Sequence, residues 1–170
     1  EGIKEAFKLL FSFDKEVYSV ILLSLYVSLA STLLSSLFAI PVGLFLGLKK
    51  FKLKRLFARV LNTAMSLPPV VVGLVVAVII SRRGPLGHLE LLFTPAAMII
   101  AQTLLVIPII TGIIFNNAND KGQEIKDICK TLGGNKWDIL ILLIKEMKIN
   151  ILIAVITGFG RAISEVGAVM

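Results

Sequence analysis

Three long stretches of this chain contain no charged residue. They cover residues 17–48, 60–81 and 91–119, and each exceeds the roughly 20 apolar residues that an α-helix needs to cross a bilayer. A fourth apolar stretch begins near Ile149 and continues to Met170. Because lipid offers no partner for an open backbone, stretches of this length predict helices that span a membrane.

The whole chain is therefore expected to form one all-α, polytopic transmembrane helical bundle. Of its 170 residues, 56% are hydrophobic, which is more than an ordinary soluble domain contains. We expect spans near residues 18–48, 60–80, 92–116 and 149–170. The sequence begins without Met and ends inside an apolar stretch, so we interpret it as a fragment from which a fifth span is missing.

Basic residues indicate how the spans are oriented. Six of them lie in the loop between the first two spans: Lys49, Lys50, Lys52, Lys54, Arg55 and Arg59. With this loop and segment 120–148 in the cytoplasm, twelve basic residues lie inside and five outside, which is the positive-inside arrangement. The N-terminus is then outside. The same arrangement accounts for the net charge of +7, so no nucleic-acid partner is expected.

A charged segment, 120–148, separates the third and fourth spans. Ile125, Ile128, Cys129 and Leu132 recur at the spacing of one helical face. The pair Gly133-Gly134 is expected to end this helix, and Asn135 to cap the next one. The pattern predicts a short surface helix, a tight turn and a second helix that returns to the bilayer. Such a protruding helix is suited to contact a cytoplasmic partner.

Small residues recur along the first span: Ser24, Ser28, Thr32, Ser36, Ala39, Gly43 and Gly47. In lipid such a stripe lets helix backbones approach closely, where van der Waals contact drives association. The alternative is a stripe that faces a hydrated pathway.

The second span is interrupted by Ser66-Leu67-Pro68-Pro69, where two backbone N–H donors are missing. Two interpretations are open: a structural kink, or a broken helix that lines a pathway, as at many transporter sites. Gln102, on the third span, is more often an interhelical hydrogen-bonding group than a ligand. We take Ser66, Pro68, Pro69 and Gln102 as candidate pathway or gate residues.

Two charges lie deep in the fourth span. Arg161 and Glu165 would each cost on the order of 3 kcal/mol in the membrane, and their i, i+4 spacing allows them to pair. The pair either stabilises the helix bundle or forms part of a gate, with Ser164 beside the route. Arg161, Ser164 and Glu165 complete the candidate pathway residues.

Several kinds of chemistry have no support in the sequence. It contains no Gly-x-x-x-x-Gly-Lys-Ser/Thr motif, so ATP binding through a P-loop is not expected and energy has to come from elsewhere. It also lacks a His-Glu-x-x-His or Cys/His cluster. No catalytic residue, metal site or cofactor is expected.

These features together resemble the permease subunits of type I ABC importers, which have the MetI-like fold. Their cytoplasmic Glu-Ala-Ala-x-x-x-Gly signature is matched loosely here by Asp127, Ile128, Cys129 and Gly133. Asp replaces Glu, and larger residues replace both alanines. Further resemblance lies in segments 67–74, 84–87, 94–96 and 158–170, so it extends over nearly the whole chain. The chain is most similar to the tungstate permeases and next to the molybdate permeases.

The resemblance implies an importer in a prokaryotic cell membrane. Two copies of the permease would form a homodimer, an external binding protein would deliver the oxyanion, and a separate ATPase subunit would drive alternating access. The implied ATPase-coupling residues are Asp127, Ile128, Cys129, Lys130, Thr131, Leu132, Gly133 and Gly134. A channel or secondary transporter would explain the kinked spans and the charge pair but leaves the surface helix without a purpose. A membrane scaffold or enzyme subunit explains the small-residue stripe and little else.

Overall fold

The computed structural model describes residues 15–82 and 84–169. Within this part the chain is helical and contains no strand, as expected for an all-α membrane protein. In chain order the elements are α2 (Lys15–Leu48), α3 (Lys54–Met65), α4 (Pro69–Ile80), the 3-10 turn η1 (Gly87–Leu89), α5 (Pro95–Thr131) and α6 (Lys136–Val169).

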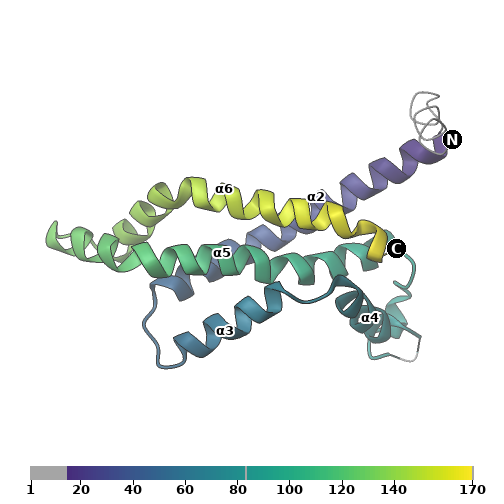
Figure 1. Cartoon of the computed structure of the whole chain (residues 1–170), viewed down its shortest axis with the longest axis horizontal. Coiled ribbons are helices and arrows are strands. Elements are labelled where there is room, and N and C mark those ends of the chain that lie inside the picture. Colours follow the sequence, from purple (N-terminus) through teal and green to yellow (C-terminus); the bar gives the residue numbers. More distant parts are fainter. Residues whose placement is uncertain (1–14, 83, 170) are drawn as a thin grey trace.

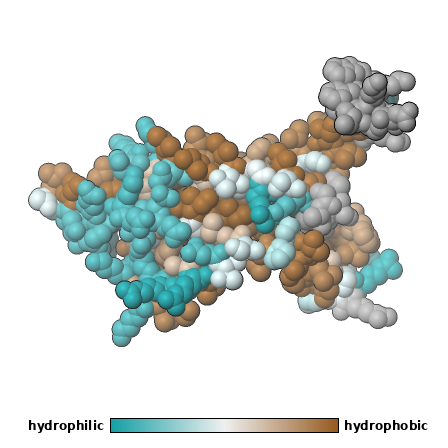
Figure 2. All heavy atoms as spheres, viewed as in Figure 1, coloured by the Kyte–Doolittle hydropathy of each residue, from teal (hydrophilic) through white to brown (hydrophobic). Residues whose placement is uncertain are grey.

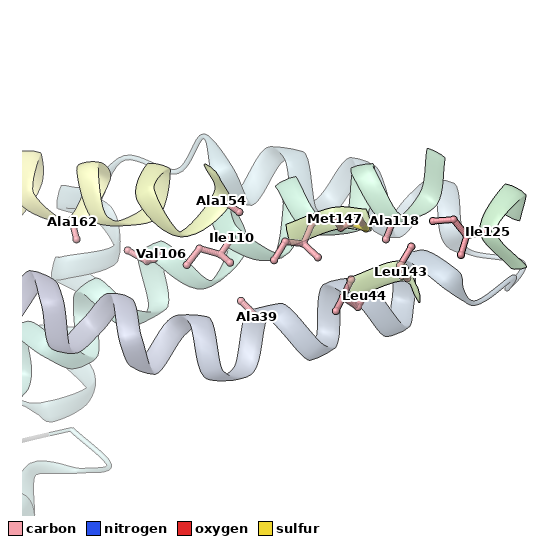
Figure 3. Packing of buried hydrophobic residues seen from close by; sticks show 11 residues of the cluster. Ala39, Leu44, Val106, Ile110, Ala118, Ile125, Leu143, Met147, Ala154 and Ala162 are labelled. Atoms are coloured by element: carbon pink, nitrogen blue, oxygen red, sulfur yellow. The ribbon is translucent and has the colours of Figure 1, made fainter. Parts of the chain in front are cut away.

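Helix α5 is the centre of the structure. It packs against α2, α3, α4 and α6, and it runs alongside α2 and α6 over much of the length of the molecule (Figure 1). The main buried cluster comes from these three long helices (Figure 3): Ala39, Leu44, Val106, Ile110, Ile114, Ala118, Ile125, Leu143, Met147, Ala154 and Ala162.

The small-residue stripe of α2 packs against α5, which confirms the packing interpretation. Gly43 lies against Ile114 and the carbonyl of Thr111, and Gly47 lies against Ala118. A Cβ at either glycine would collide with α5, so glycine permits the close approach. The buried stripe is wider than predicted, because Ser31 and Ser35 are also fully buried.

The predicted second span is two helices rather than one. Helix α3 ends at Met65, α4 begins at Pro69, and the two axes differ by 92°. Pro68 adopts an extended conformation with φ −64° and ψ 132°, and Pro69 occupies the first turn of α4, where its missing N–H costs nothing. Of the two interpretations left open by the sequence, the structure has the broken helix; that the break lines a pathway stays a prediction.

Length and apolar composition identify two helices able to cross a membrane, α2 from Val17 onward and α5. The bent α3–α4 pair adds a third if it is one span. The fourth span, in α6, stays a prediction. Figure 2 shows hydrophobic residues over much of the molecule and hydrophilic ones gathered at the end where α5 meets α6.

One expectation about this end is wrong. The segment after residue 116 does not form a separate short helix, because α5 continues without interruption to Thr131. No proline interrupts α5 between Pro108 and its end, and Gly122 packs against Leu48 at the end of α2. Lateral packing thus extends beyond the apolar stretch and keeps the helix intact.

Candidate coupling surface and polar sites

The turn between α5 and α6 is a Schellman motif. The Gly134 N–H donates to the Cys129 carbonyl at 2.8 Å, and the Gly133 N–H donates to the Lys130 carbonyl at 3.0 Å. Gly133 has φ +78°, the left-handed conformation that favours glycine at this position. The predicted helix stop is confirmed, and its geometry defines how α6 leaves α5.

Asn135 caps α6, as predicted. Its side-chain oxygen accepts from the N–H groups of Trp137 at 2.8 Å and Asp138 at 3.1 Å. The Asp138 carboxylate accepts in return from the Asn135 N–H at 2.8 Å. This reciprocal pair is a capping box in which Asp takes the place of Glu. The turn is therefore fixed by backbone hydrogen bonds on the α5 side and by side chain–backbone hydrogen bonds on the α6 side.

The predicted helical face at the end of α5 is divided by packing. Ile125 and Cys129 are buried, whereas Ile128 is exposed and Leu132 is 81% exposed. Trp137, in the first turn of α6, is 72% exposed. Leu132 and Trp137 are thus large apolar side chains exposed at a charged end of the protein.

We call this surface the tip, defined as residues 127–137. Its polar members Asp127, Lys130 and Thr131 are exposed. Asp127 accepts from the Gln123 amide at 2.8 Å, and the Thr131 hydroxyl donates to the Asp127 carbonyl at 2.8 Å. Sequence reasoning missed Trp137. An aromatic residue two positions after a helix cap, in an otherwise charged segment, was the signal that could have revealed it.

Gln102 joins three helices. Its side-chain oxygen accepts from the Ser31 hydroxyl of α2 at 3.1 Å, and its amide donates to the Ala162 carbonyl of α6 at 3.1 Å. The side chain is buried. The interpretation of Gln102 as an interhelical hydrogen-bonding group is thus confirmed.

Arg161 and Glu165 form the predicted ion pair. The side chain of Arg161 is 36% exposed and that of Glu165 is 12% exposed, so the pair lies at the edge of the buried core. The Ser164 hydroxyl donates to the Arg161 carbonyl at 2.9 Å and is exposed. Gln102, Arg161 and Glu165 line one shallow depression between α5 and α6.

Ser66, Pro68 and Pro69 do not line that depression. Ser66 and Pro68 are exposed at the break between α3 and α4, and the Ser66 hydroxyl donates to the Asn62 carbonyl at 3.4 Å. The preceding residue, Met65, lies in a notch left by Gly112 of α5. The predicted pathway residues therefore fall into two separate groups, one at the break and one at the ion pair.

Residues 39–169 match the family described as binding-protein-dependent transport system inner membrane component. The chain belongs to this family. Its members are permease subunits of ABC importers, which are transport proteins embedded in a membrane. The predicted family resemblance is confirmed over most of the chain.

Curated relatives are similar over most of this chain. The tungstate uptake system permease protein TupB of Peptoclostridium acidaminophilum is 52% identical over 170 residues, which are 100% of this chain and 75% of that protein. A probable anion ABC transporter permease protein of Haloferax volcanii is 41% identical over 89% of this chain and 66% of its own length. The molybdate/tungstate permease WtpB of Methanocaldococcus jannaschii is 30% identical over 92% of this chain and 64% of its own.

Proposed function

We propose that this chain is the membrane-spanning permease subunit of an ATP-driven oxyanion importer. Tungstate is the proposed substrate, with molybdate next. An external binding protein delivers the anion, and a separate ATPase subunit supplies the energy. The observation that carries the proposal is the tip: a turn fixed by hydrogen bonds that presents Leu132 and Trp137 to solvent.

The proposed coupling relies on the continuity of α5. A displacement of the tip by the ATPase would be passed along α5, because the helix is continuous from Pro95 to Thr131, with Pro108 inside it. Gln102 lies 29 residues before Thr131, or about 44 Å along the helix axis. Through its bonds to Ser31 and Ala162 it would carry this movement to α2 and α6. The coupling residues are those of segment 127–134, with Trp137 added.

The proposed route uses the two groups of polar residues differently. At the break, Ser66 and Pro68 are exposed, and a broken helix leaves backbone groups for a hydrated pathway. Near the ion pair, Ser164 is exposed while Gln102 is buried. We therefore assign Ser66 and Ser164 to the route and Gln102 to the joint between helices, with Arg161 and Glu165 as gate candidates.

The substrate proposal is supported by the names of the relatives, which specify tungstate, molybdate or an unspecified anion. For the assembly we propose a homodimer in the cell membrane with the N-terminus outside. The orientation follows from the basic loop 49–59. A channel or secondary transporter is the competing class, and it would leave the exposed apolar residues of the tip without a partner.

Uptake in liposomes tests the proposal. The full-length permease is reconstituted with its ATPase and with candidate binding proteins, and ATP-dependent accumulation of tungstate, molybdate and sulfate is measured. We expect accumulation of tungstate that depends on ATP and on the binding protein. Anion flux without ATP or ATPase would favour the competing class.

A further inference from the structure

A pocket with basic walls lies between the 49–54 loop, the start of α3 and the middle of α5. Its volume is about 490 Å³. Lys52, Lys54 and Arg55 line one side, Asn116 and Asn119 of α5 line the other, and Phe115 forms part of the apolar wall. The pocket is separate from the tip, the break at residues 66–68 and the ion pair of α6.

The positive charge of this pocket is not neutralised by the protein. Segment 49–59 contains six basic residues and no acidic one. Within residues 15–82 and 84–169, no carboxylate forms an ion pair with Lys52, Lys54 or Arg55. The nearest acid on α5, Asp120, accepts from the Asn119 amide at 3.3 Å. A concave surface with several cations and no counterion is suited to an anionic group.

Lys54 is fixed by its surroundings. Its ammonium group donates to the Gly47 carbonyl at the end of α2 and lies 5.6 Å from the centre of the Phe115 ring. Burial lowers the pKa of Lys54, and the charge of Lys50 lowers it further. An anion in the pocket would oppose both effects. Lys52 and Arg55 are exposed, so their side chains are free to close on a ligand.

The outer face of α3 indicates where this anion comes from. On the side of α3 that faces away from the pocket-lining residues, Leu53, Leu56 and Val60 are each more than half exposed, and they form one apolar stripe at i, i+3 and i+7. A basic helix with such a stripe is typical of a segment at the surface of a membrane. The stripe therefore indicates that α3 lies in the membrane interface, at the depth of the lipid phosphates, where Arg55 offers a phosphate site.

We propose that this pocket binds the phosphate headgroup of an anionic phospholipid. Lys52 and Arg55 contact the phosphate, and Arg55 does so with two parallel N–H groups. Asn116 and Asn119 donate from α5. Basic pockets at the cytoplasmic side of membrane helices bind such headgroups. The lipid then ties α3 to α5 at the end opposite the break at residues 66–68.

Native mass spectrometry tests this site. The full-length permease with its ATPase is placed in nanodiscs of phosphatidylcholine with one fifth phosphatidylglycerol, released into detergent, and analysed for retained lipid. We expect the wild-type protein to retain phosphatidylglycerol in excess of its share of the disc. K52Q/R55Q should lower that retention roughly 30-fold, since each cation near a membrane surface contributes about fivefold. K52R, which keeps the charge at this position and leaves Arg55 in place, should retain the lipid.

A matched control is K15Q/R82Q, which removes two exposed positive charges elsewhere and should leave retention unchanged. Equal retention by K52Q/R55Q and wild type would overturn the proposal. A second arm uses pure phosphatidylcholine discs and titrates inorganic phosphate and tungstate by calorimetry. Binding of either anion that is lost in K52Q/R55Q, without selective retention of phosphatidylglycerol, would assign the pocket to a soluble anion and overturn the lipid assignment. Because lipid retention does not depend on transport, it distinguishes this proposal from the proposed importer function.

Discussion

Replacement of Gly133 separates backbone strain from partner contact at the tip. The backbone at this position has φ +78°, which costs a residue such as Ala about 1–2 kcal/mol. Asn and Asp adopt this conformation more readily, because their short polar side chains bond locally. The space around Gly133 is open, with no atom within 4 Å of the position that a Cβ would occupy. Any side chain at this position therefore points into open space, where the proposed ATPase contact would lie.

The two effects predict opposite orders in a series of variants. For thermal stability of the isolated permease, G133A should lose the most, about 2–8 °C for a chain of this size, and G133N and G133D less. For ATPase retention the order should reverse, because Asp and Asn add bulk, and Asp adds charge, at the contact. G133D should insert in the membrane and lose the ATPase and uptake, whereas G133A should keep part of both.

Two measurements follow this series: a thermal melt of each permease without ATPase, and the amount of ATPase that co-purifies with it. Gly134 offers a control within the turn. Its Cβ would collide with the Cys129 side chain and carbonyl. G134A should therefore lower stability, but its added methyl group points into the turn and not toward the proposed ATPase contact. If ATPase retention falls in the same order as the melting temperature across all variants, the loss of ATPase is explained by a destabilised turn and not by a lost contact between position 133 and the ATPase. Full retention and uptake in G133D would refute the tip as the coupling surface.

Three further predictions concern topology and the polar sites. Cysteines placed in 50–58 should react with membrane-impermeant reagents only from the cytoplasm, and those in 84–88 only from outside. Labelling of 50–58 from outside would show that the proposed orientation in the membrane is inverted. Replacing Arg161 or Glu165 alone leaves a charge without its partner and should lower the stability of the permease by a few kcal/mol. In a thermal melt, R161A/E165Q should lose less stability than the sum of the two single variants. If the two losses simply add, the pair contributes no coupling energy. Q102L removes two bonds between helices, each worth about 0.6–1.7 kcal/mol in membranes, and should lower the melting temperature, while an unchanged melt would exclude Gln102 as the joint.

Local chemistry was enough to predict several features. The adjacent prolines at 68 and 69 remove two successive N–H donors, and the structure has the break there. Gly133 and Asn135 define the turn between α5 and α6 through φ and capping, which depend on a few neighbouring residues. The ion pair of Arg161 and Glu165 follows from helical spacing alone. The family follows from residues spread along the chain.

Packing between distant segments decided the rest. Periodicity placed Ile125, Cys129 and Leu132 on one face, but only the position of neighbouring helices buries the first two and exposes the third. The continuity of α5 beyond residue 116 depends on contacts such as that of Gly122 with Leu48, 74 positions earlier in the chain. The basic pocket requires Lys52 and Asn119 to face each other. A sequence shows which face of a helix is apolar or charged, whereas the tertiary structure determines what that face meets, because burial is a property of two surfaces.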